Sequence, residues 1–199
     1  MKNQKQKPIL FWSGGKDSWL AYQTWTKQQG IPPVLLTTFD DESKIIPYQN
    51  IHIQTVFRQA IKLGLTLIPV ALSHPVSNEV YIQTVTDAMD QSPFEHDTLL
   101  FGDWHLDDIR KWREETFGNL GYQCMFPIWK KPIEELIGII ESEQVEIRIR
   151  CADSNFDGFI KKGALYDRRF VENLLETIDP MGENGEFHTE VILDLEYNS

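Results

Sequence analysis

The sequence lacks the features of several protein classes. None of its apolar runs approaches the roughly 20 residues that a membrane-spanning helix needs. The polar N-terminus, Met1 to Lys7, has no apolar stretch of the kind found in signal peptides, so we expect a cytoplasmic protein. The two cysteines, Cys124 and Cys151, form neither a CxxC pair nor a disulfide framework.

Basic residues are also scarce. The 199 residues include 19 lysines and arginines against 30 acidic residues, which gives a net charge of −11. An acidic chain repels nucleic acid unless its basic residues are locally concentrated, so RNA is disfavoured as a substrate. With 41% hydrophobic and 25% charged residues, the composition is that of a globular protein long enough to bury a core.

Strand-like and helix-like segments alternate along the chain, which predicts an α/β fold with a doubly wound, mostly parallel sheet. The predicted strands are 8–12, 34–39, 65–72, 98–101 and 124–129, and the predicted helices between them are 19–29, 49–63, 79–89 and 106–117. Pro69 predicts an edge position for the third strand, because proline cannot donate to a sheet ladder. We interpret residues 1–120 as a nucleotide-binding domain.

The remaining residues, 121–199, predict a smaller C-terminal α+β lobe on the substrate side. Pro132 suits the first position of a helix, and residues 144–151 alternate between apolar and polar side chains, as in a strand with one solvated face. A last helix is predicted over 165–178. A loop rich in glycine and acidic residues then leads into a final strand that ends near Leu195.

The strongest functional signal is a short loop between the first predicted strand and helix, Ser13-Gly14-Gly15-Lys16-Asp17-Ser18. Its two glycines let backbone N–H groups approach an anion, and the positive end of the following helix points to the same place. The two serines add hydroxyl donors, and Lys16 adds a positive charge. Asp17 is a suitable Mg²⁺ ligand, so the loop predicts a phosphate site for ATP and Mg²⁺.

Two common phosphate loops are excluded by spacing. A Walker A loop needs glycine where Leu10 stands and serine or threonine where Asp17 stands, and the GxGxxG pattern of dinucleotide loops is absent. The alternative is a plain strand-to-helix turn. Two glycines are compatible with such a turn, but a lysine, an aspartate and two serines beside them are more than it requires.

The loop resembles the pyrophosphate-binding loop of the N-type ATP pyrophosphatases, which include GMP, NAD and asparagine synthetases and tRNA thiolases. The resemblance implies a Rossmann-like fold of the adenine nucleotide alpha-hydrolase type. It also implies adenylation, in which an oxygen nucleophile attacks the α-phosphate and pyrophosphate leaves. N–H groups and a lysine around the leaving group would stabilise its charge as it develops.

Residues 182–189, Gly-Glu-Asn-Gly-Glu-Phe-His-Thr, are similar to the C-terminal signature of the diphthine–ammonia ligase family within that superfamily. Weaker similarities occur in the same order along the chain, at Gln59-Ala60, Leu63-Gly64, Gly102-Asp103, Arg113-Glu114 and Pro127-Ile128-Trp129. Two positions depart from the family pattern. Met181 stands where the family commonly has cysteine, and residues 40–42 replace its usual motif after the second strand.

This resemblance implies that ATP, ammonium and a carboxylate acceptor give an amide, AMP and pyrophosphate. In the namesake enzymes the carboxylate belongs to diphthine on elongation factor 2. Glu183, Glu186 and His188 would then bind ammonium, orient the acyl-adenylate or accept a proton. No glutaminase domain is present, so ammonia comes from solution or a partner, and a homodimer is possible.

Four further residues are expected to contact the nucleotide: Thr38, His52, Gly102 and Asp103. Asp103 ends a predicted strand, where α/β proteins form their sites. The family has a histidine near the start of the helix that contains His52.

Structural interpretations compete with several of these assignments. His52 shares an apolar helical stripe and suits a packed position, and His188 at a strand start suits a structural one. The competing interpretation of Glu183 and Glu186 is that they solvate a loop, and that of Arg113 is pairing with Glu114 or Asp108 on a helix surface.

Two other functions remain open. A tRNA-modifying thiolase of the same superfamily generally needs catalytic cysteines, whereas Cys124 and Cys151 are far apart in the sequence and the net charge of −11 disfavours tRNA. A sensor that binds ATP or AMP without turnover needs the loop but not the cluster of Glu183, Glu186 and His188.

Overall fold

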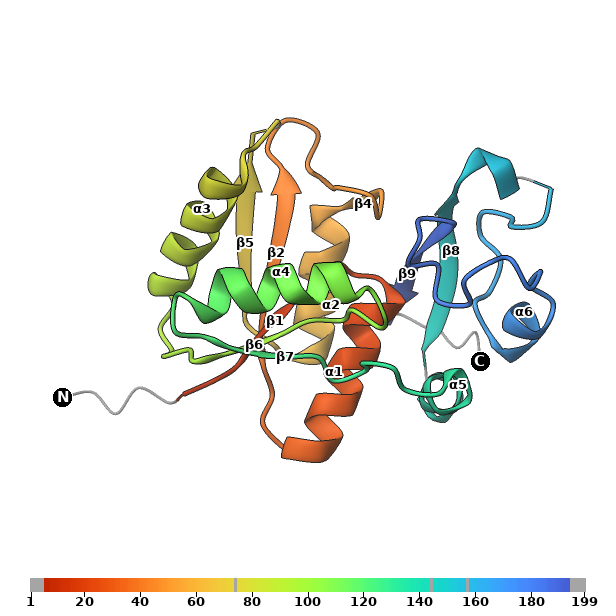
Figure 1. Ribbon diagram of the computed structural model, residues 1–199, viewed down its shortest axis with the longest axis horizontal. Coiled ribbons are helices and arrows are strands. Elements are labelled where there is room, and N and C mark those ends of the chain that lie inside the picture. The colour runs from red at the N-terminus through yellow and green to blue at the C-terminus, as the bar shows by residue number, and fades with distance from the viewer. Residues whose placement is uncertain (1–5, 74, 144, 157, 194–199) are drawn as a thin grey trace.

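The computed structural model describes residues 6–73, 75–143, 145–156 and 158–193, and Figure 1 shows its architecture. Its central sheet has the strand order β5-β2-β1-β6-β7, and every neighbouring pair is parallel. The strands are β1 (Ile9–Phe11), β2 (Val34–Asp40), β5 (Leu67–Leu72), β6 (Thr98–Leu100) and β7 (Gln123–Met125). The predicted doubly wound α/β fold is confirmed.

Helices cover both faces of the sheet, and each face has its own apolar core. Helices α1 (Lys16–Gln29) and α2 (Ile53–Leu63) contribute Trp19 and Val56 to one core. Helices α3 (Asn78–Asp90) and α4 (Asp107–Gly118) contribute Val85 and Phe117 to the other. The chain order reverses between β1 and β6, and sheets of this kind bind ligands at the carboxyl ends of the strands beside such a reversal.

One edge strand of the sheet agrees with the prediction from the sequence, and the other differs from it. Strand β5, which contains Pro69, lies at one edge, as predicted. The opposite edge is β7, which is shorter than the predicted strand 124–129 because residues 127–130 form a turn. The sheet therefore continues to residue 125.

The C-terminal lobe, residues 146–192, lies beside this sheet and is joined to it through α5 (Ile133–Ser142), which contacts α1. It contains the antiparallel pair β8 (Glu146–Ala152) and β9 (Phe187–Ile192), the 3₁₀ turn η1 (Ser154–Phe156) and the short helix α6 (Arg168–Glu172). Buried side chains of the lobe, including Tyr166 and Phe187, belong to the same core as Trp19. The lobe thus packs against α1 of the sheet domain through shared apolar contacts.

The predicted helix over 49–63 starts later than expected. A hairpin of β3 (Ile45–Ile46) and β4 (Ile51–His52) comes first, and α2 begins at Ile53. Ile51 is buried in the core from an extended position, and the Nδ1 of His52 accepts a hydrogen bond from the backbone N–H of Gln54 at 3.2 Å. His52 is therefore the N-cap of α2 instead of a residue on its apolar stripe.

The predicted helix over 165–178 is wrong, since only Arg168–Glu172 is α-helical there. The backbone N–H of Tyr166 donates to Ile147 at 2.7 Å, so the chain just before α6 runs alongside β8 and cannot coil. Gln144, the first residue of one predicted strand, and Leu195, near the end of another, lie outside the described residues.

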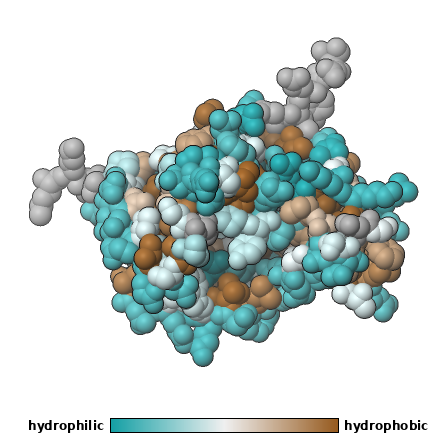
Figure 2. All heavy atoms as spheres, turned by 90° about the horizontal axis from the view of Figure 1, so that it is seen from above, coloured by the Kyte–Doolittle hydropathy of each residue, from teal (hydrophilic) through white to brown (hydrophobic). Residues whose placement is uncertain are grey.

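Within the described residues, no helix has both the length and the apolar character needed to cross a bilayer. Figure 2 shows the molecule from the side to which β2 and β5 point in Figure 1. Hydrophilic residues dominate this face, and the apolar residues form small, separate patches.

Candidate active site

A pocket of about 660 Å³ opens at the carboxyl ends of β1, β2 and β6, where the doubly wound fold places ligands. Its wall combines residues of the sheet domain with residues of the C-terminal lobe. Eight of the candidate residues from the sequence line it: Ser13, Asp17, Ser18, Thr38, Gly102, Asp103, Glu183 and His188. Segments more than 160 residues apart in the sequence, such as Ser13 and Glu183, therefore meet in one cavity.

The loop at 13–18 folds back so that the first turn of α1 faces this pocket. Gly14 has φ of 82°, a left-handed conformation that favours glycine, and Gly15 is the N-cap of α1. The hydroxyl of Ser13 lies 3.4 Å from that of Ser18 and accepts a long bond from the backbone N–H of Gly15, also at 3.4 Å. The positive end of the α1 dipole is thus directed at the cavity, as an anion site requires.

Strand β9 holds this loop in place through hydrogen bonds. The backbone N–H of Lys16 donates to Thr189 Oγ1 at 3.0 Å, and the N–H of Val191 donates to the carbonyl of Gly14 at 2.9 Å. The buried amide of Gln59 donates to the carbonyls of Gly14 at 3.1 Å and Val191 at 2.7 Å. The C-terminal lobe is therefore part of the scaffold that shapes the loop.

Removing the Thr189 hydroxyl is expected to destabilise this junction. Thr189 is 1% exposed, so a Thr189→Val variant leaves a buried backbone N–H without its acceptor, at a cost of about 2 kcal/mol. Thr189→Ser keeps the acceptor and loses one methyl group, at about 1 kcal/mol. Chemical denaturation of the three proteins measures both differences, and a valine variant as stable as wild type contradicts this role.

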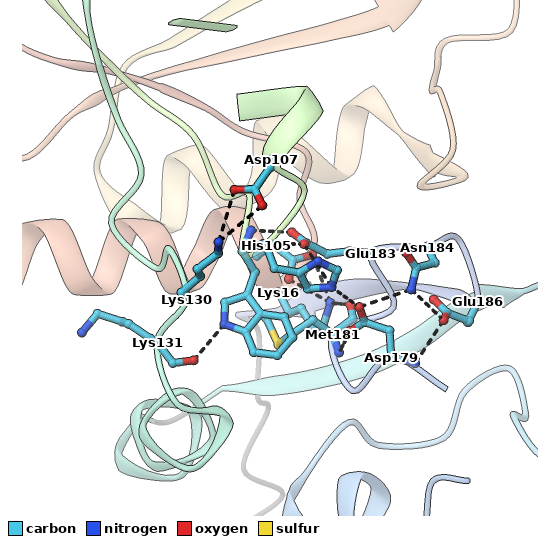
Figure 3. Close-up of polar contacts among 12 residues, drawn as sticks. Lys16, His105, Asp107, Lys130, Lys131, Asp179, Met181, Glu183, Asn184 and Glu186 are labelled. Carbon is cyan, nitrogen blue, oxygen red and sulfur yellow. Dashed lines mark hydrogen bonds and ion pairs between the residues drawn. The ribbon is translucent and has the colours of Figure 1, made fainter. Parts of the chain in front are cut away.

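Lys16, whose side chain is predicted to contact phosphate, is not among the described residues that line the pocket. Its ammonium group is 2.9 and 3.0 Å from the two oxygens of Asp17 and also donates to the carbonyl of Met181 (Figure 3). It lies 5.3 Å from the ring centre of Tyr166 and 5.4 Å from that of Phe187. The C-terminal lobe thus encloses this cation. A buried charge needs partners, and here they are a carboxylate, a carbonyl and two aromatic faces.

A Lys16→Met variant is expected to unfold at a lower temperature. It leaves the Asp17 carboxylate without its cation, and because that side chain is 27% exposed we take the lower end of the usual cost, about 3 kcal/mol. For a chain of this length, that is a fall of roughly 6–12 °C in Tm. Lys27→Met, in the exposed last turn of the same helix, is the control. A Lys16→Met protein with the melting temperature of the control contradicts this assignment.

Burial shifts the pKa values of Asp17 and His188 in opposite senses. Burial raises the pKa of Asp17, although the positive charge of Lys16 partly offsets this effect. Burial and the charge of Lys16 lower the pKa of His188, which is therefore neutral at pH 7. His188 Nδ1 lies 3.5 Å from the Gln49 side-chain amide. A neutral imidazole in a pocket is able to accept a proton.

Glu183 links the C-terminal lobe to the loop after β6. Its carboxylate accepts hydrogen bonds from the backbone N–H groups of Trp104 and of His105, the latter at 2.8 Å (Figure 3). Burial raises the pKa of Glu183, and these N–H donors oppose the rise. Burial disfavours the charged form of His105, but the hydrogen bond to Asp179 and the negative charges of Asp179 and Glu183 together outweigh burial and raise its pKa. The ring of His105 thus lies between two carboxylates, since Glu183 Oε2 is 3.7 Å from its Nε2.

Besides Lys16, two predicted site residues, Glu186 and His52, lie outside the pocket wall as the structure describes it. Glu186 is buried and does not line the pocket; its Oε1 accepts hydrogen bonds from the Asp179 backbone at 3.0 Å and from Asn184 at 3.3 Å. His52 caps α2 and is likewise absent from the pocket wall as described. Gly14 and Gly15 are not among the described lining residues either, and they shape the backbone of the loop that carries Ser13, Asp17 and Ser18.

The sequence did not indicate several residues that build the site. Arg113 pairs with Asp103 instead of Glu114 or Asp108, and Glu114 pairs with Arg110. Gln59, Thr189 and the His105–Asp179 pair were also missed. The signal available for Arg113 was its spacing from Asp103, ten positions across a strand-to-helix turn, which is compatible with contact but does not require it.

Comparison with known proteins adds little to this geometry. No protein-family model matches the chain, and no curated protein matches it. Among solved structures, it is similar to the U34-tRNA thiolase NcsA from Methanococcus maripaludis, solved with its [4Fe-4S] cluster, at 16% identity and a TM-score of 0.43. The match covers 70% of this chain and 57% of that one, so this chain spans little more than half of the NcsA chain. The function of the pocket must be inferred from its own residues.

Proposed function

We propose that this protein binds ATP in the pocket, adenylates a carboxylate and transfers ammonia to it, releasing pyrophosphate, AMP and an amide. The observation that carries the proposal is the meeting of the 13–18 loop with Glu183 and His188 across one cavity. The loop and the N-terminus of α1 supply donors for the pyrophosphate end of ATP. Glu183 and His188 supply groups suited to a cationic nitrogen nucleophile.

Two groups of lining residues differ in chemistry, which fits a nucleotide and an acceptor in one pocket. The first group consists of aromatic side chains of the sheet domain, namely Phe11, Tyr81, Phe101 and Trp112. Flat apolar surfaces of this kind suit a nucleobase. The second group contains Gln49, Glu183 and His188, which offer hydrogen bonds to the acceptor and to ammonium.

The size and donor set of the site fit Mg²⁺-bound ATP. A volume of about 660 Å³ lies in the range of small-molecule sites. Among the described residues, no three His, Cys, Asp or Glu side chains converge as a metal site. This suits an ion held largely by phosphate and water, with Asp17 as the protein ligand. Bound Mg²⁺ would neutralise part of the phosphate charge.

The proposed reaction has two steps. An oxygen of the acceptor carboxylate attacks the α-phosphorus of ATP, and the bond to the β-phosphate oxygen breaks while the first turn of α1 stabilises the departing pyrophosphate. Ammonia then attacks the acyl carbon, and the bond to AMP breaks. His188, neutral at pH 7, takes a proton from ammonium to form the nucleophile.

The cysteines give no support to thiolation as the second step. Cys124 donates to the Arg113 carbonyl at 3.5 Å and Cys151 to the Tyr48 carbonyl at 3.6 Å. Burial raises the pKa of both thiols, so neither is present as the nucleophilic thiolate at pH 7.

The acceptor class can be tested directly. The full chain is incubated with ATP, Mg²⁺, ammonium chloride and a panel of acceptors that includes small carboxylic acids, diphthine-bearing elongation factor 2 and tRNA with a sulfur donor. We expect AMP release that depends on both ammonium and one carboxylate, with the amide detected by mass spectrometry. AMP release with tRNA alone contradicts amide formation, and ATP binding without AMP release from any acceptor indicates a sensor.

A further inference from the structure

Arg113 differs from every other described residue of the pocket wall. It is the single lysine or arginine among the lining residues that the structure describes, whereas Asp17, Asp103 and Glu183 are acidic. Lys16 is turned into the C-terminal lobe and is not part of the wall. An anionic ligand that extends beyond the N-terminus of α1 therefore meets Arg113 as its main positive side chain.

The guanidinium group is held rigidly. Its Nε lies 2.7 Å from Asp103 Oδ2, and its Nη2 donates to Asp103 Oδ1 at 3.1 Å. Its central carbon lies 4.3 Å from the ring centre of Phe101. The ion pair, the one hydrogen bond and the ring of Phe101 together fix the guanidinium group. The side chain is 21% exposed and lines the cavity, so a positive charge is held in place there.

Gly102 places this pair beside the phosphate loop. A Cβ atom on Gly102 would lie 2.8 Å from the backbone carbon and oxygen of Asp17 and 2.9 Å from the nitrogen of Ser18. The loop after β6 thus contacts the first turn of α1, and the next residue is Asp103, the partner of Arg113. The Asp103–Arg113 pair thus comes directly after a residue that contacts the helix terminus we assign to pyrophosphate.

We propose that Arg113 is a catalytic residue that binds the α-phosphate of ATP, an inference that rests on the proposed function. The N-terminus of α1 binds the pyrophosphate end of ATP, and the next phosphate along the nucleotide is the α-phosphate. Negative charge grows on its oxygens as the carboxylate attacks, and a fixed guanidinium stabilises that charge without reorganisation. The same contact holds the adenylate until ammonia displaces AMP.

AMP and adenosine distinguish this role from a structural one, because they differ only in the α-phosphate. The affinities of both ligands are measured by calorimetry for wild type, Arg113→Gln, Arg113→Lys and Arg110→Gln. Arg110 lies one turn earlier on α4, pairs with Glu114 and stacks on Trp129, outside the pocket wall as described, so it is the matched control. Thermal unfolding of each protein verifies its fold.

We expect Arg113→Gln to weaken AMP binding by about 10-fold, the usual effect of losing one charged hydrogen-bond donor, and to leave adenosine binding unchanged. Arg113→Lys retains the charge and loses less AMP affinity, and Arg110→Gln matches wild type. Equal losses for AMP and adenosine, or no loss of either, overturn the proposal. A raised KM for the acceptor with unchanged AMP affinity also overturns it. Failure of the wild type to bind adenine nucleotides instead refutes the proposed function itself, and the inference with it.

Discussion

Replacing Gly102 with alanine is expected to lower kcat/KM for ATP by about 100-fold, since a displacement of about 1 Å in a site has effects of this size. The added Cβ atom would lie 2.8 Å from the carbon and oxygen of Asp17, well inside van der Waals contact. Those atoms are backbone, so no side chain can rotate away. The loop after β6 and the first turn of α1 must separate, which moves Asp103 and Ser18 relative to each other. Initial rates of AMP formation measure the effect.

Gly138→Ala provides the matched control for the same substitution. Gly138 lies within α5, and nothing lies within 4 Å of a Cβ atom added there. Alanine in a helix interior is favoured over glycine by roughly 0.5–1 kcal/mol, so this variant is expected to be active and slightly more stable. A Gly102→Ala protein as active as Gly138→Ala shows that the contact between the two loops has no part in the site.

Replacing His188 with glutamine is expected to lower ammonium-dependent turnover by about 100-fold at pH 7.5, the lower end of the effect of a general base. The effect depends on pH. Burial and the charge of Lys16 lower the pKa of His188 below its ordinary value, and the proposed role needs the neutral form. The ratio of wild-type to variant activity is therefore expected to be constant near pH 7 and to fall at more acid pH, as His188 becomes protonated.

Using this ratio removes the contribution of ammonia itself, whose free concentration changes with pH equally for both proteins. His96→Gln is the control, since His96 contacts the Lys7 carbonyl at 2.7 Å and is not among the described residues of the pocket wall. A ratio that rises toward acid pH indicates that the protonated imidazole is the active form and excludes His188 as the base.

Most of the sheet was predictable because its signals are local. Short apolar runs separated by amphipathic helices identify β1, β2, β5 and β6, and Pro69 identifies an edge. The phosphate loop was equally visible, since its glycines, serines and charged residues are contiguous. Six of the eight predicted residues that line the pocket lie at or just after the carboxyl ends of β1, β2 and β6, which meet at one edge of the sheet, whereas Glu183 and His188 come from the C-terminal lobe.

The features that could not be predicted arise where tertiary contacts override local pattern. Residues 165–178 contain enough apolar spacing for a helix, but pairing of the preceding segment with β8 shortens it to Arg168–Glu172. The direction of the Lys16 side chain depends on Met181, Tyr166 and Phe187, all far away in the sequence. Likewise, Glu183 accepts hydrogen bonds from backbone N–H groups. Nearly every residue type has such a group, so the sequence does not identify these donors.

The most direct test of the central claim is to identify which phosphate bond of ATP is broken. The full chain is incubated with ATP, Mg²⁺, ammonium chloride and the acceptor panel, and the products are followed by phosphorus NMR. The pocket geometry predicts AMP and pyrophosphate in equal amounts, because the N-terminus of α1 stabilises pyrophosphate as the leaving group. Formation of ADP and inorganic phosphate would contradict cleavage between the α- and β-phosphates.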